Sequence, residues 1–391
     1  MAPDASPATR GGPLVGLKVI EMAGLGPVPL AALMMAEMGA EVLRIERAGG
    51  EYPLLDLPDE FDLSRHGRSI LKVDLKHAAG RELLLKLAEN ADILLEGFRP
   101  HVMERLGLGP DAVLARNPAL VYGRMTGFGQ DGPLAGRAGH DITYLALSGV
   151  LSAIGRKDER PVPPLNLVAD YGGGTMMLLA GVLAALFSRS RTGRGQVVDA
   201  AMVEGAATLS APLHAYLAAG LWRDSRGENL LDSGAPFYDT YEAADGKYVA
   251  VGCLEQRFFA EFARLLPLDP RFVAGQYDRS LWSEMRKAIA ARIRQRPRDD
   301  WESHFGGSDA CVAPVLSLHE APRHPHNRAR QAFVDIGSLH RPAPSPRFSA
   351  TPSTVAAPPD KSGGDVARAL TGFDLAGDAL DALVESGVVR K

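Results

Sequence analysis

The first third of the chain alternates two kinds of apolar pattern. Short, nearly continuous apolar runs are typical of buried strands, and longer segments with helical periodicity are typical of helices. Strands are predicted over residues 17–24, 41–46, 91–96 and 119–125, and helices over residues 29–38, 77–89 and, as helical turns, 101–116. Such alternation is characteristic of a parallel sheet with crossover helices. The pattern therefore predicts a large α/β domain of the Rossmann-like kind.

The pattern changes after residue 233. Residues 234–253 alternate apolar and polar positions on both sides of Asp245-Gly246, which is a hairpin signal. Helices are predicted over residues 255–266, 279–295 and 299–305, followed by a proline-rich extended connector over 341–360 and a helix near 376–386. These features predict a second, smaller α+β domain. The predicted organisation is a disordered lead over 1–12, the large domain over 13–205, a connector over 206–233, the small domain over 234–318 and a return segment over 319–391.

One apolar run, Thr175–Phe187, is long enough to raise the question of a membrane. It is shorter than the roughly 18 residues that a membrane-spanning helix needs. We therefore predict a buried core helix at this position and no association with a membrane.

Composition narrows the possible functions. Hydrophobic residues make up 46% and charged residues 23% of the 391 residues, which is typical of a soluble globular protein. The net charge of −4 leaves no overall positive field that could hold nucleic acid. The two cysteines, Cys253 and Cys311, cannot build a disulfide framework, so we expect a reducing, cytoplasmic location. The histidines at 319, 324 and 326 lack a helical ligand spacing, and we predict no metal site.

Residues 127–132 spell GxGxxG directly after a predicted strand. A dinucleotide-binding site also requires a helix that opens at this loop. Pro133 and a further glycine-rich stretch follow instead. The sequence thus favours a flexible loop beside a site over a pyrophosphate-binding turn.

Basic residues follow several of the predicted strands. Arg47 ends the second strand, at the sheet edge where open α/β folds bind their ligands. Further basic residues are Arg65, Arg68, Lys72, Lys76, Arg99 and Arg105. Each alone is typical of a solvated surface charge, whereas together they suit the polyanionic tail of a cofactor.

Three acidic residues and one histidine are candidates for chemistry. His140 and Asp141 lie in a glycine-rich stretch, where a structural and a functional role are about equally open. Asp170 precedes three glycines and the apolar run, so it is either an acid at a helix N-terminus or a functional carboxylate beside a backbone that a ligand can approach. Glu255 begins a predicted helix, where the helix dipole favours an acidic residue in the first turn.

The chain resembles the α-methylacyl-CoA racemase branch of the family III CoA-transferase superfamily from about Gly12 to Ala350. The segments that carry the resemblance include GLKVIEMAGLGP, GAEVLRIER, LEGFRPHVMERLGLGP, RMTGFGQDGP, AGHDITYLALSG, PPLNLVADYGGG and GRGQVVD. AGHD combined with PPLNLVADYGGG is specific to the racemase branch, whereas GRGQVVD and LEGFRP occur across the superfamily.

The resemblance implies a fold and a set of site residues. It implies an interlocked homodimer, in which the large domain of one subunit and the small domain of the other form each active site. His140 and Asp170 would transfer protons, with Asp141 and Glu255 as supporting acids, and Glu255 would reach His140 across the subunit boundary. The CoA site would be lined by Arg47, Val73, Lys76, Gly97, Phe98, Arg99, Arg105 and the Gly139–Tyr144 stretch.

The implied activity is epimerisation of 2-methylacyl-CoA thioesters through an enolate at carbon 2. A His/Asp pair near neutral pH supplies one group in base form and one in acid form. No cofactor is implied, because CoA is part of the substrate. Two alternatives stay open: a CoA transferase in which Asp170 attacks the thioester, and a CoA-binding protein without catalysis. His140 argues against the first, and the four acid–base residues together argue against the second.

Two positions depart from the family pattern. Val28 stands where the family often has glycine, and Gln256-Arg257 stand where it has Pro-Gln. The shape of the acyl pocket and the rigidity of the helix that follows Glu255 therefore stay open.

Overall fold

The computed structural model describes residues 11–49, 57–360, 364–375 and 377–390. They form two compact units, of which unit 1 comprises the chain up to Ser148, Leu165–Leu209 and the chain from Gln331 onward. Unit 2 comprises Gly149–Pro164 and Ser210–Arg330. The predicted disordered lead, except for its last two residues, lies outside the described part of the chain.

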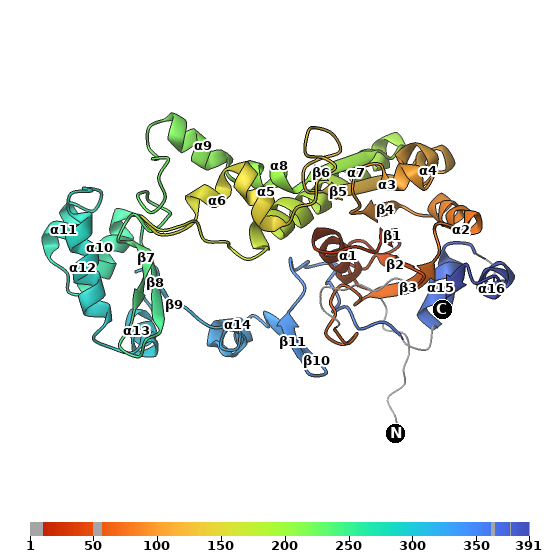
Figure 1. Cartoon of the computed structure of the whole chain (residues 1–391). Coiled ribbons are helices and arrows are strands. Elements are labelled where there is room, and N and C mark those ends of the chain that lie inside the picture. Colours follow the sequence, from red (N-terminus) through yellow and green to blue (C-terminus); the bar gives the residue numbers. More distant parts are fainter. Residues whose placement is uncertain (1–10, 50–56, 361–363, 376, 391) are drawn as a thin grey trace, which may run out of the picture. The chain divides into compact units, whose positions relative to one another are not determined.

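Unit 1 is built on a seven-stranded sheet with the strand order β12-β3-β2-β1-β4-β5-β6 (Figure 1). Its strands are β1 (Lys18–Met22), β2 (Glu41–Arg47), β3 (Arg68–Val73), β4 (Ile93–Glu96), β5 (Val121–Thr126), β6 (Val197–Ala201) and β12 (Val389–Arg390). All neighbours pair in parallel except β12, which runs antiparallel to β3. The predicted parallel sheet is confirmed, and β3, β6 and β12 extend it beyond the four predicted strands.

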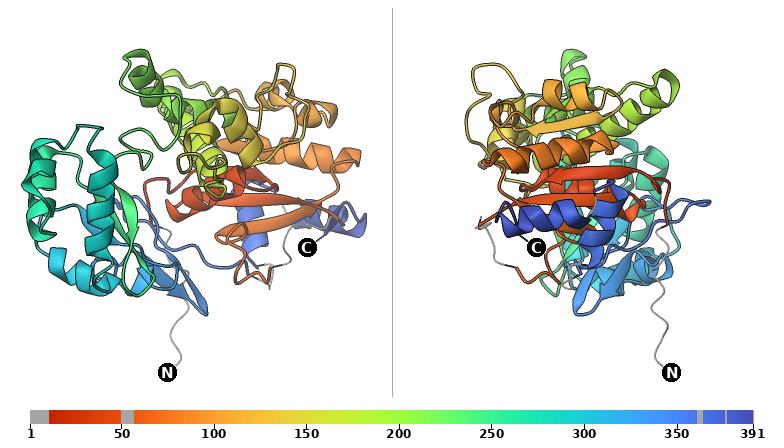
Figure 2. Two further views of the ribbon diagram at one scale, coloured as in Figure 1. Left: turned by 60° about the vertical axis from the view of Figure 1, so that its left-hand side comes forward. Right: turned by 90° about the vertical axis from the view of Figure 1, so that its right-hand side faces the viewer.

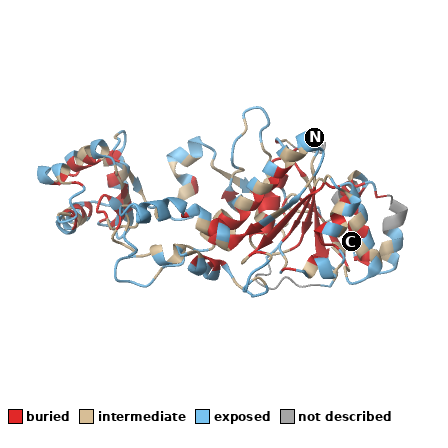
Figure 3. Ribbon diagram, turned by 90° about the horizontal axis from the view of Figure 1, so that it is seen from above, coloured by how far each residue is buried: buried red, intermediate tan, exposed pale blue. Residues whose placement is uncertain are grey.

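Helices cover both faces of this sheet, and its strands are buried between them (Figure 3). On one face, Ile20, Leu43 and Leu71 form a core with apolar side chains of α2 (Ala78–Glu89), α4 (Pro110–Arg116) and α15 (Gly364–Gly372). The other face carries α1 (Pro27–Glu37) and α7 (Met176–Thr192), and Gly123 of β5 lies against Leu178 of α7. The remaining elements of unit 1 are α3 (Val102–Arg105), α5 (Asp141–Ser148), η1 (Leu167–Thr175), α8 (Met202–Leu209), β10 (Phe333–Ile336), β11 (Leu339–Pro342) and α16 (Gly377–Glu385).

The apolar run predicted as a buried core helix is buried along one face only. η1 and α7 form a continuous helix, Leu167–Thr192, which is long and apolar enough to cross a membrane by length and composition. Leu178 and Val182 pack on β5, whereas Phe187 is 65% exposed. The sheet covers one side of the run within this unit, so the predicted core helix is buried along that side and exposed along the other.

Unit 2 contains a small antiparallel sheet with the strand order β7-β8-β9 and helices packed around an aromatic core (Figure 2). β7 (Tyr238–Glu242) and β8 (Tyr248–Gly252) form the predicted hairpin, and Gly246 adopts the positive φ that its turn requires. The core includes Phe237, Phe259 and Trp301. The other elements are α6 (Val150–Ala153), α9 (Ala211–Ala218), α10 (Gln256–Leu265), α11 (Pro270–Ala274), α12 (Trp282–Ile293), α13 (Arg298–Phe305), β9 (Val312–Pro314), η2 (Ala321–Arg323) and α14 (Pro325–Ala329).

Candidate active site

Hydrogen bonds between the backbone of His140 and Thr143 fix His140 immediately before α5. Its carbonyl oxygen accepts hydrogen bonds from the N–H and Oγ1 of Thr143 at 2.8 and 2.7 Å, and its N–H donates to Thr143 Oγ1 at 3.0 Å. These bonds hold the backbone before the first turn of the helix, while the residue as a whole is exposed. The imidazole is therefore accessible to a ligand from a well-anchored position.

Asp141, the next residue, ties α5 to η1. Its side chain is buried, and Oδ1 accepts hydrogen bonds from the backbone N–H groups of Ala169 at 2.8 Å and Asp170 at 2.7 Å. These N–H groups belong to the first turn of η1, where helix geometry leaves donors without partners. Oδ2 of Asp141 is buried without a hydrogen-bond partner in the described part of the chain. Asp141 thus holds the backbone of Asp170 with one oxygen.

Asp170 is half-buried, with Asn166 Nδ2 3.5 Å from its Oδ2. Burial raises the pKa of Asp170, and the negative charge of Asp141 raises it further, while Asn166 and the charge of His140 act in the opposite direction. These influences show that His140, Asp141 and Asp170 lie within electrostatic reach of one another. A carboxyl group with a raised pKa beside an imidazole is suited to proton transfer near neutral pH.

Tyr144 forms one wall of this cluster. Its pKa is raised by burial and then by the charge of Asp170, and Arg99 opposes this shift. Its ring lies edge-on to Phe128 with the ring centroids 4.9 Å apart. A Cβ at Gly127 or Gly139 would lie 2.2 or 2.5 Å from Tyr144 Cε1, so both positions need glycine. The GxGxxG loop therefore packs beside the site, as predicted, and no helix begins within residues 127–132.

The three glycines at 172–174 allow η1 to pack closely against α8. A Cβ at Gly173 would lie 2.6 Å from the backbone nitrogen of Ala206 in α8. Gly205 likewise meets the backbone of Gly173. The close approach that these glycines permit is therefore to α8 of the same unit.

The residues implied to bind CoA lie near the carboxyl ends of the parallel strands. Arg47 ends β2, and its register partner Val73 ends β3, with Lys76 in the turn that follows. Gly97, Phe98 and Arg99 follow β4, and Arg105 ends α3. Arg47, Lys76, Arg99 and Arg105 are exposed, whereas the side chain of Val73 packs in the core. Tyr144 is buried and Gly139 is partly exposed beside it.

Two of the basic residues grouped with them belong to an internal ion network. Arg68 is 2% exposed; its Nε donates to Glu21 Oε2 at 3.0 Å, and its guanidinium also donates to backbone carbonyls. Arg65 Nε lies 3.3 Å from Asp59 Oδ1, and Arg65 Nη2 lies 3.7 Å from Glu46 Oε2. Arg68 is therefore neither a solvated surface charge nor available to a cofactor tail, and this part of the prediction was wrong.

Sequence reasoning missed a buried carboxylate beneath the predicted CoA loop. Oε2 of Glu96 accepts the N–H of Phe98 at 2.8 Å, and its Oε1 accepts Nε of Arg124 at 3.1 Å. Arg124 also donates to Glu104 in α3 at 2.8 Å. Burial raises the pKa of Glu96 to about 7, although Phe98 and Arg124 oppose the shift. The only signal in the sequence was a glutamate at the last position of an otherwise apolar strand.

Glu255 lies in unit 2 as the N-cap residue of α10, and its side chain makes no capping hydrogen bond. It is exposed, so its carboxylate is available to a partner outside unit 2. Within the described residues, no group of three or more His, Cys, Asp or Glu side chains could hold a metal ion.

Comparison with known proteins places this geometry in a family. A family model for CoA-transferase family III matches residues 14–366. An alpha-methylacyl-CoA racemase from Mus musculus is 47% identical over 353 residues, which cover 90% of this chain and 91% of that protein. An alpha-methylacyl-CoA racemase from Homo sapiens is 44% identical, with 87% of each chain covered. The crystal structure of a CAIB/BAIF family protein from Brucella suis superposes with a TM-score of 0.76 at 25% identity, covering 93% of this chain and 100% of that one.

Proposed function

Because the chain belongs to CoA-transferase family III, we propose that it epimerises 2-methylacyl-CoA thioesters, as an α-methylacyl-CoA racemase. The observation that carries the proposal is the cluster of His140, Asp141 and Asp170, in which Asp141 anchors the backbone of Asp170. The identity of 47% and 44% to two racemases over most of the chain supports the same reaction.

The reaction moves one proton at carbon 2 of the acyl group. One member of the His140–Asp170 pair removes this proton, and the other returns a proton to the opposite face of carbon 2. The two residues exchange roles when the other epimer reacts. The raised pKa of Asp170 brings its proton affinity closer to that of an imidazole, which favours such an exchange near neutral pH.

The intermediate is an enolate whose charge lies on the thioester oxygen. Backbone N–H groups of the glycine-rich loops beside Tyr144 are the candidate donors to this oxygen, because fixed dipoles stabilise developing charge without reorganisation. CoA is bound as part of the substrate, with Arg47, Lys76, Arg99 and Arg105 available to its phosphates at the sheet edge. No further cofactor takes part in this scheme.

The assembly that we propose is an obligate homodimer with shared active sites. Glu255 of the partner subunit would stand near His140, where its charge would favour the imidazolium and fix the tautomer. The exposed carboxylate of Glu255, which makes no capping hydrogen bond, and the exposed position of His140 support this arrangement.

One experiment separates the proposal from the two alternatives. A single 2-methylacyl-CoA epimer is incubated with the protein in deuterated water without an acceptor acid, and carbon 2 is followed by NMR. Exchange with epimerisation is the expected result. No exchange, together with CoA transfer once an acceptor acid is supplied, would indicate a transferase that uses Asp170 as nucleophile. Binding without either event would indicate a CoA-binding protein.

A further inference from the structure

Three charged residues form a row across the sheet of unit 1, at the ends of three neighbouring strands. Glu96, Arg124 and Asp199 are register partners on the parallel strands β4, β5 and β6. Register partners project to the same face of a sheet, so Arg124 stands between the two acidic residues. Leu94 and Tyr122, two residues earlier on β4 and β5, belong to the core beneath α2 and α4. The charged row therefore continues that face of the sheet.

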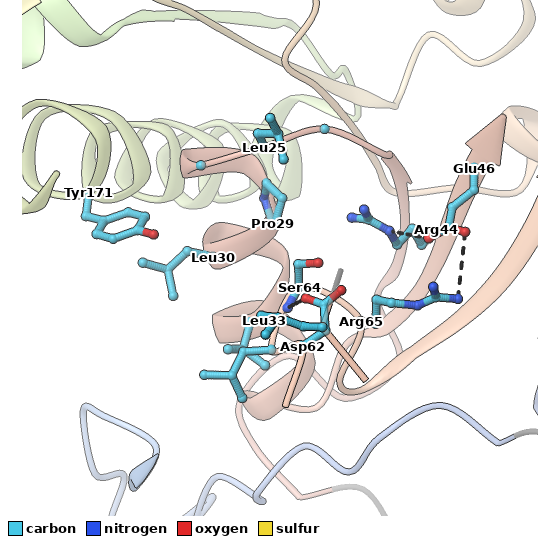
Figure 4. Close-up of a pocket in the computed structure, with 14 residues that line it drawn as sticks. Leu25, Pro29, Leu30, Leu33, Arg44, Glu46, Asp62, Ser64, Arg65 and Tyr171 are labelled. Atoms are coloured by element: carbon cyan, nitrogen blue, oxygen red, sulfur yellow. Dashed lines mark hydrogen bonds and ion pairs between the residues drawn. The ribbon is translucent and has the colours of Figure 1, made fainter. Parts of the chain in front are cut away.

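The charged row lies on the opposite face of the sheet from the pocket of about 440 Å³ that Figure 4 shows. Arg44 and Glu46 of β2 line that pocket, whereas Ile45 between them packs in the core that the charged row continues. Because side chains alternate along a strand, Arg47 projects to the face of Ile45. The charged row thus shares its face of the sheet with one of the residues implied to bind CoA.

One end of the charged row holds the loop 97–99. Glu96 is buried, and its Oε2 accepts the backbone N–H of Phe98 at 2.8 Å. Its Oε1 accepts Nε of Arg124 at 3.1 Å, and Nη2 of Arg124 donates to Oε1 of Glu104 in α3 at 2.8 Å. Through these two carboxylates, Arg124 is tied to both of the segments after β4 that carry arginines implied to bind CoA.

The other end of the charged row holds the loop 127–132. Burial raises the pKa of Asp199, while the charge of Arg124 and a hydrogen bond from the backbone N–H of Gln130 act in the opposite direction. Asp199 therefore binds the backbone of this loop and lies within electrostatic reach of Arg124. The loop packs beside Tyr144, and its N–H groups are among the proposed donors to the enolate oxygen.

Arg124 is shared by the two ends of the charged row. Glu96 and Asp199 lie on strands that are not neighbours, because β5 separates β4 from β6. Arg124 is 8% exposed, so water screens its interactions with the carboxylates only weakly. Its guanidinium is planar and rigid, so a shift of Glu96 that turns this group also changes its position relative to Asp199.

We propose that Arg124 is a positioning residue that couples CoA binding on the loop 97–99 to the placement of the loop 127–132. The inference rests on the proposed racemase activity and deepens it by naming how the CoA moiety is used. Occupation of the first loop by CoA fixes Glu96, and Arg124 then fixes Asp199 and the N–H groups of the second loop. Binding energy from the CoA moiety thereby increases the rate of proton transfer as well as the affinity.

The test compares the CoA thioester of one 2-methylacyl epimer with the matching pantetheine thioester, which lacks the nucleotide and its phosphates. The wild type should have a kcat about tenfold higher for the CoA ester, because only this ester fully engages the loop 97–99. Arg124→Met should reduce the ratio of the two kcat values to about one, and Arg124→Lys, which keeps the positive charge, should restore part of it. The control Arg116→Met, at an exposed, ion-paired arginine of α4, should keep the wild-type ratio.

The ratio separates positioning from a loss of stability. A variant that is only less stable contains less folded protein, which lowers both kcat values equally and leaves their ratio unchanged. Asp199→Asn provides the same test if Arg124→Met does not fold, because Asp199 is exposed. This variant removes the charge that faces Arg124 but keeps an oxygen for the N–H of Gln130, and it should also lower the ratio.

Two results would overturn the inference. One is an equal kcat for the two esters in the wild type, and the other is a wild-type ratio in Asp199→Asn or in folded Arg124→Met. Deuterium exchange at carbon 2 of the CoA ester, measured in the wild type, tests the racemase activity itself. Absence of exchange would contradict the proposed function, whereas exchange with equal kcat values for both esters would contradict only the role of Arg124.

Discussion

Oδ1 of Asp141 accepts the backbone N–H of Asp170 at 2.7 Å, across 29 residues of sequence. The same oxygen accepts the N–H of Ala169, so one carboxylate oxygen from the first residue of α5 binds two N–H groups near the start of η1. The side chain that fixes Asp170 is therefore adjacent in sequence to His140. Asp141 therefore links the backbone positions of His140 and Asp170, the two candidate proton-transfer residues.

The first prediction separates the two effects of Asp141 on Asp170. Asp141→Asn keeps an oxygen that can accept both N–H groups but removes the negative charge. Because that charge helps to raise the pKa of Asp170, the variant should have a lower Asp170 pKa. The limb of the pH–rate profile that reports Asp170 ionisation should accordingly move to lower pH, which kinetic titration of kcat/KM would measure.

Asp141→Ala is the matched comparison, because it removes the acceptor together with the charge. The buried N–H of Ala169 and the partly buried N–H of Asp170 then lose their partner, and stability should fall by about 1–3 kcal/mol in denaturant unfolding. If Asp141→Asn loses as much stability as Asp141→Ala, the role assigned to Oδ1 is wrong.

The sequence predicted the parallel sheet because the apolar positions of β1, β2, β4 and β5 recur as short runs between predicted helices, although Arg44 in β2 and Arg124 in β5 interrupt two of them. β3 was not predicted as a strand, because Arg68 and Lys72 leave it only a short apolar run. Arg68 is nevertheless buried, since Glu21 on β1 supplies the countercharge from 47 residues away. A pattern along one strand cannot reveal a countercharge on another.

Some residues of the candidate site could be predicted from the sequence, and others could not. His140, Asp141 and Asp170 could be chosen from motifs, because each lies in a short segment whose residue types suggest chemistry. Asn166 and Glu96 could not be chosen, because their importance lies in hydrogen bonds to Asp170 and Phe98 that only the fold creates.

The second prediction concerns the proton-transfer pair itself. His140→Ala and Asp170→Ala should each lower the rate of epimerisation by about 10²–10⁴-fold, the usual contribution of a general acid or base. Chiral analysis of the product measures the rate, and the unfolding temperature checks the fold. Asp111→Ala, at an exposed carboxylate of α4, should retain activity. A variant of either residue with wild-type turnover would remove that residue from the mechanism.

The third prediction concerns the phosphate contacts of CoA. Arg47→Ala and Arg99→Ala should each raise KM for the acyl-CoA substrate about tenfold, as expected for the loss of a charge-assisted hydrogen bond. The dependence of KM on salt should also become shallower, because fewer ion contacts remain to be screened. Unchanged KM values in both variants would place the phosphate site elsewhere.

The fourth prediction uses the raised pKa of Glu96. Burial raises this pKa from 4.5 to about 7, so the folded state holds the proton more tightly than the unfolded state. The stabilisation from the protonated carboxyl is fully present below pH 4.5 and is lost as pH rises through about 7. Glu96→Gln removes this titration, and its stability relative to the wild type should increase by about 3 kcal/mol across that window.

Denaturant unfolding at several pH values measures the difference between the two proteins. Glu82→Gln, at an exposed carboxylate of α2, should keep the pH dependence of the wild type. Because Glu96 also accepts the N–H of Phe98, KM should respond more than kcat in Glu96→Gln. A parallel pH dependence of stability in wild type and Glu96→Gln would contradict the assigned titration.

The last prediction is that the chain works as a homodimer with shared active sites. Ile142, Leu147, Leu167, Met176, Phe187 and Leu209 are large apolar side chains that are exposed in unit 1 on α5, η1, α7 and α8. A second subunit that covers them would remove this apolar area from water, which favours assembly. Asp170 lies in unit 1 and Glu255 in unit 2, so an exchange of units between subunits would build each site from two chains.

The test is complementation between two variants. Glu255→Ala and Asp170→Ala chains, each poorly active alone, are co-expressed so that they form mixed dimers. If sites are shared, one site of the mixed dimer carries both substitutions and the other carries neither, so activity should partly return. A monomer by light scattering, or mixed dimers no more active than either parent, would contradict shared sites.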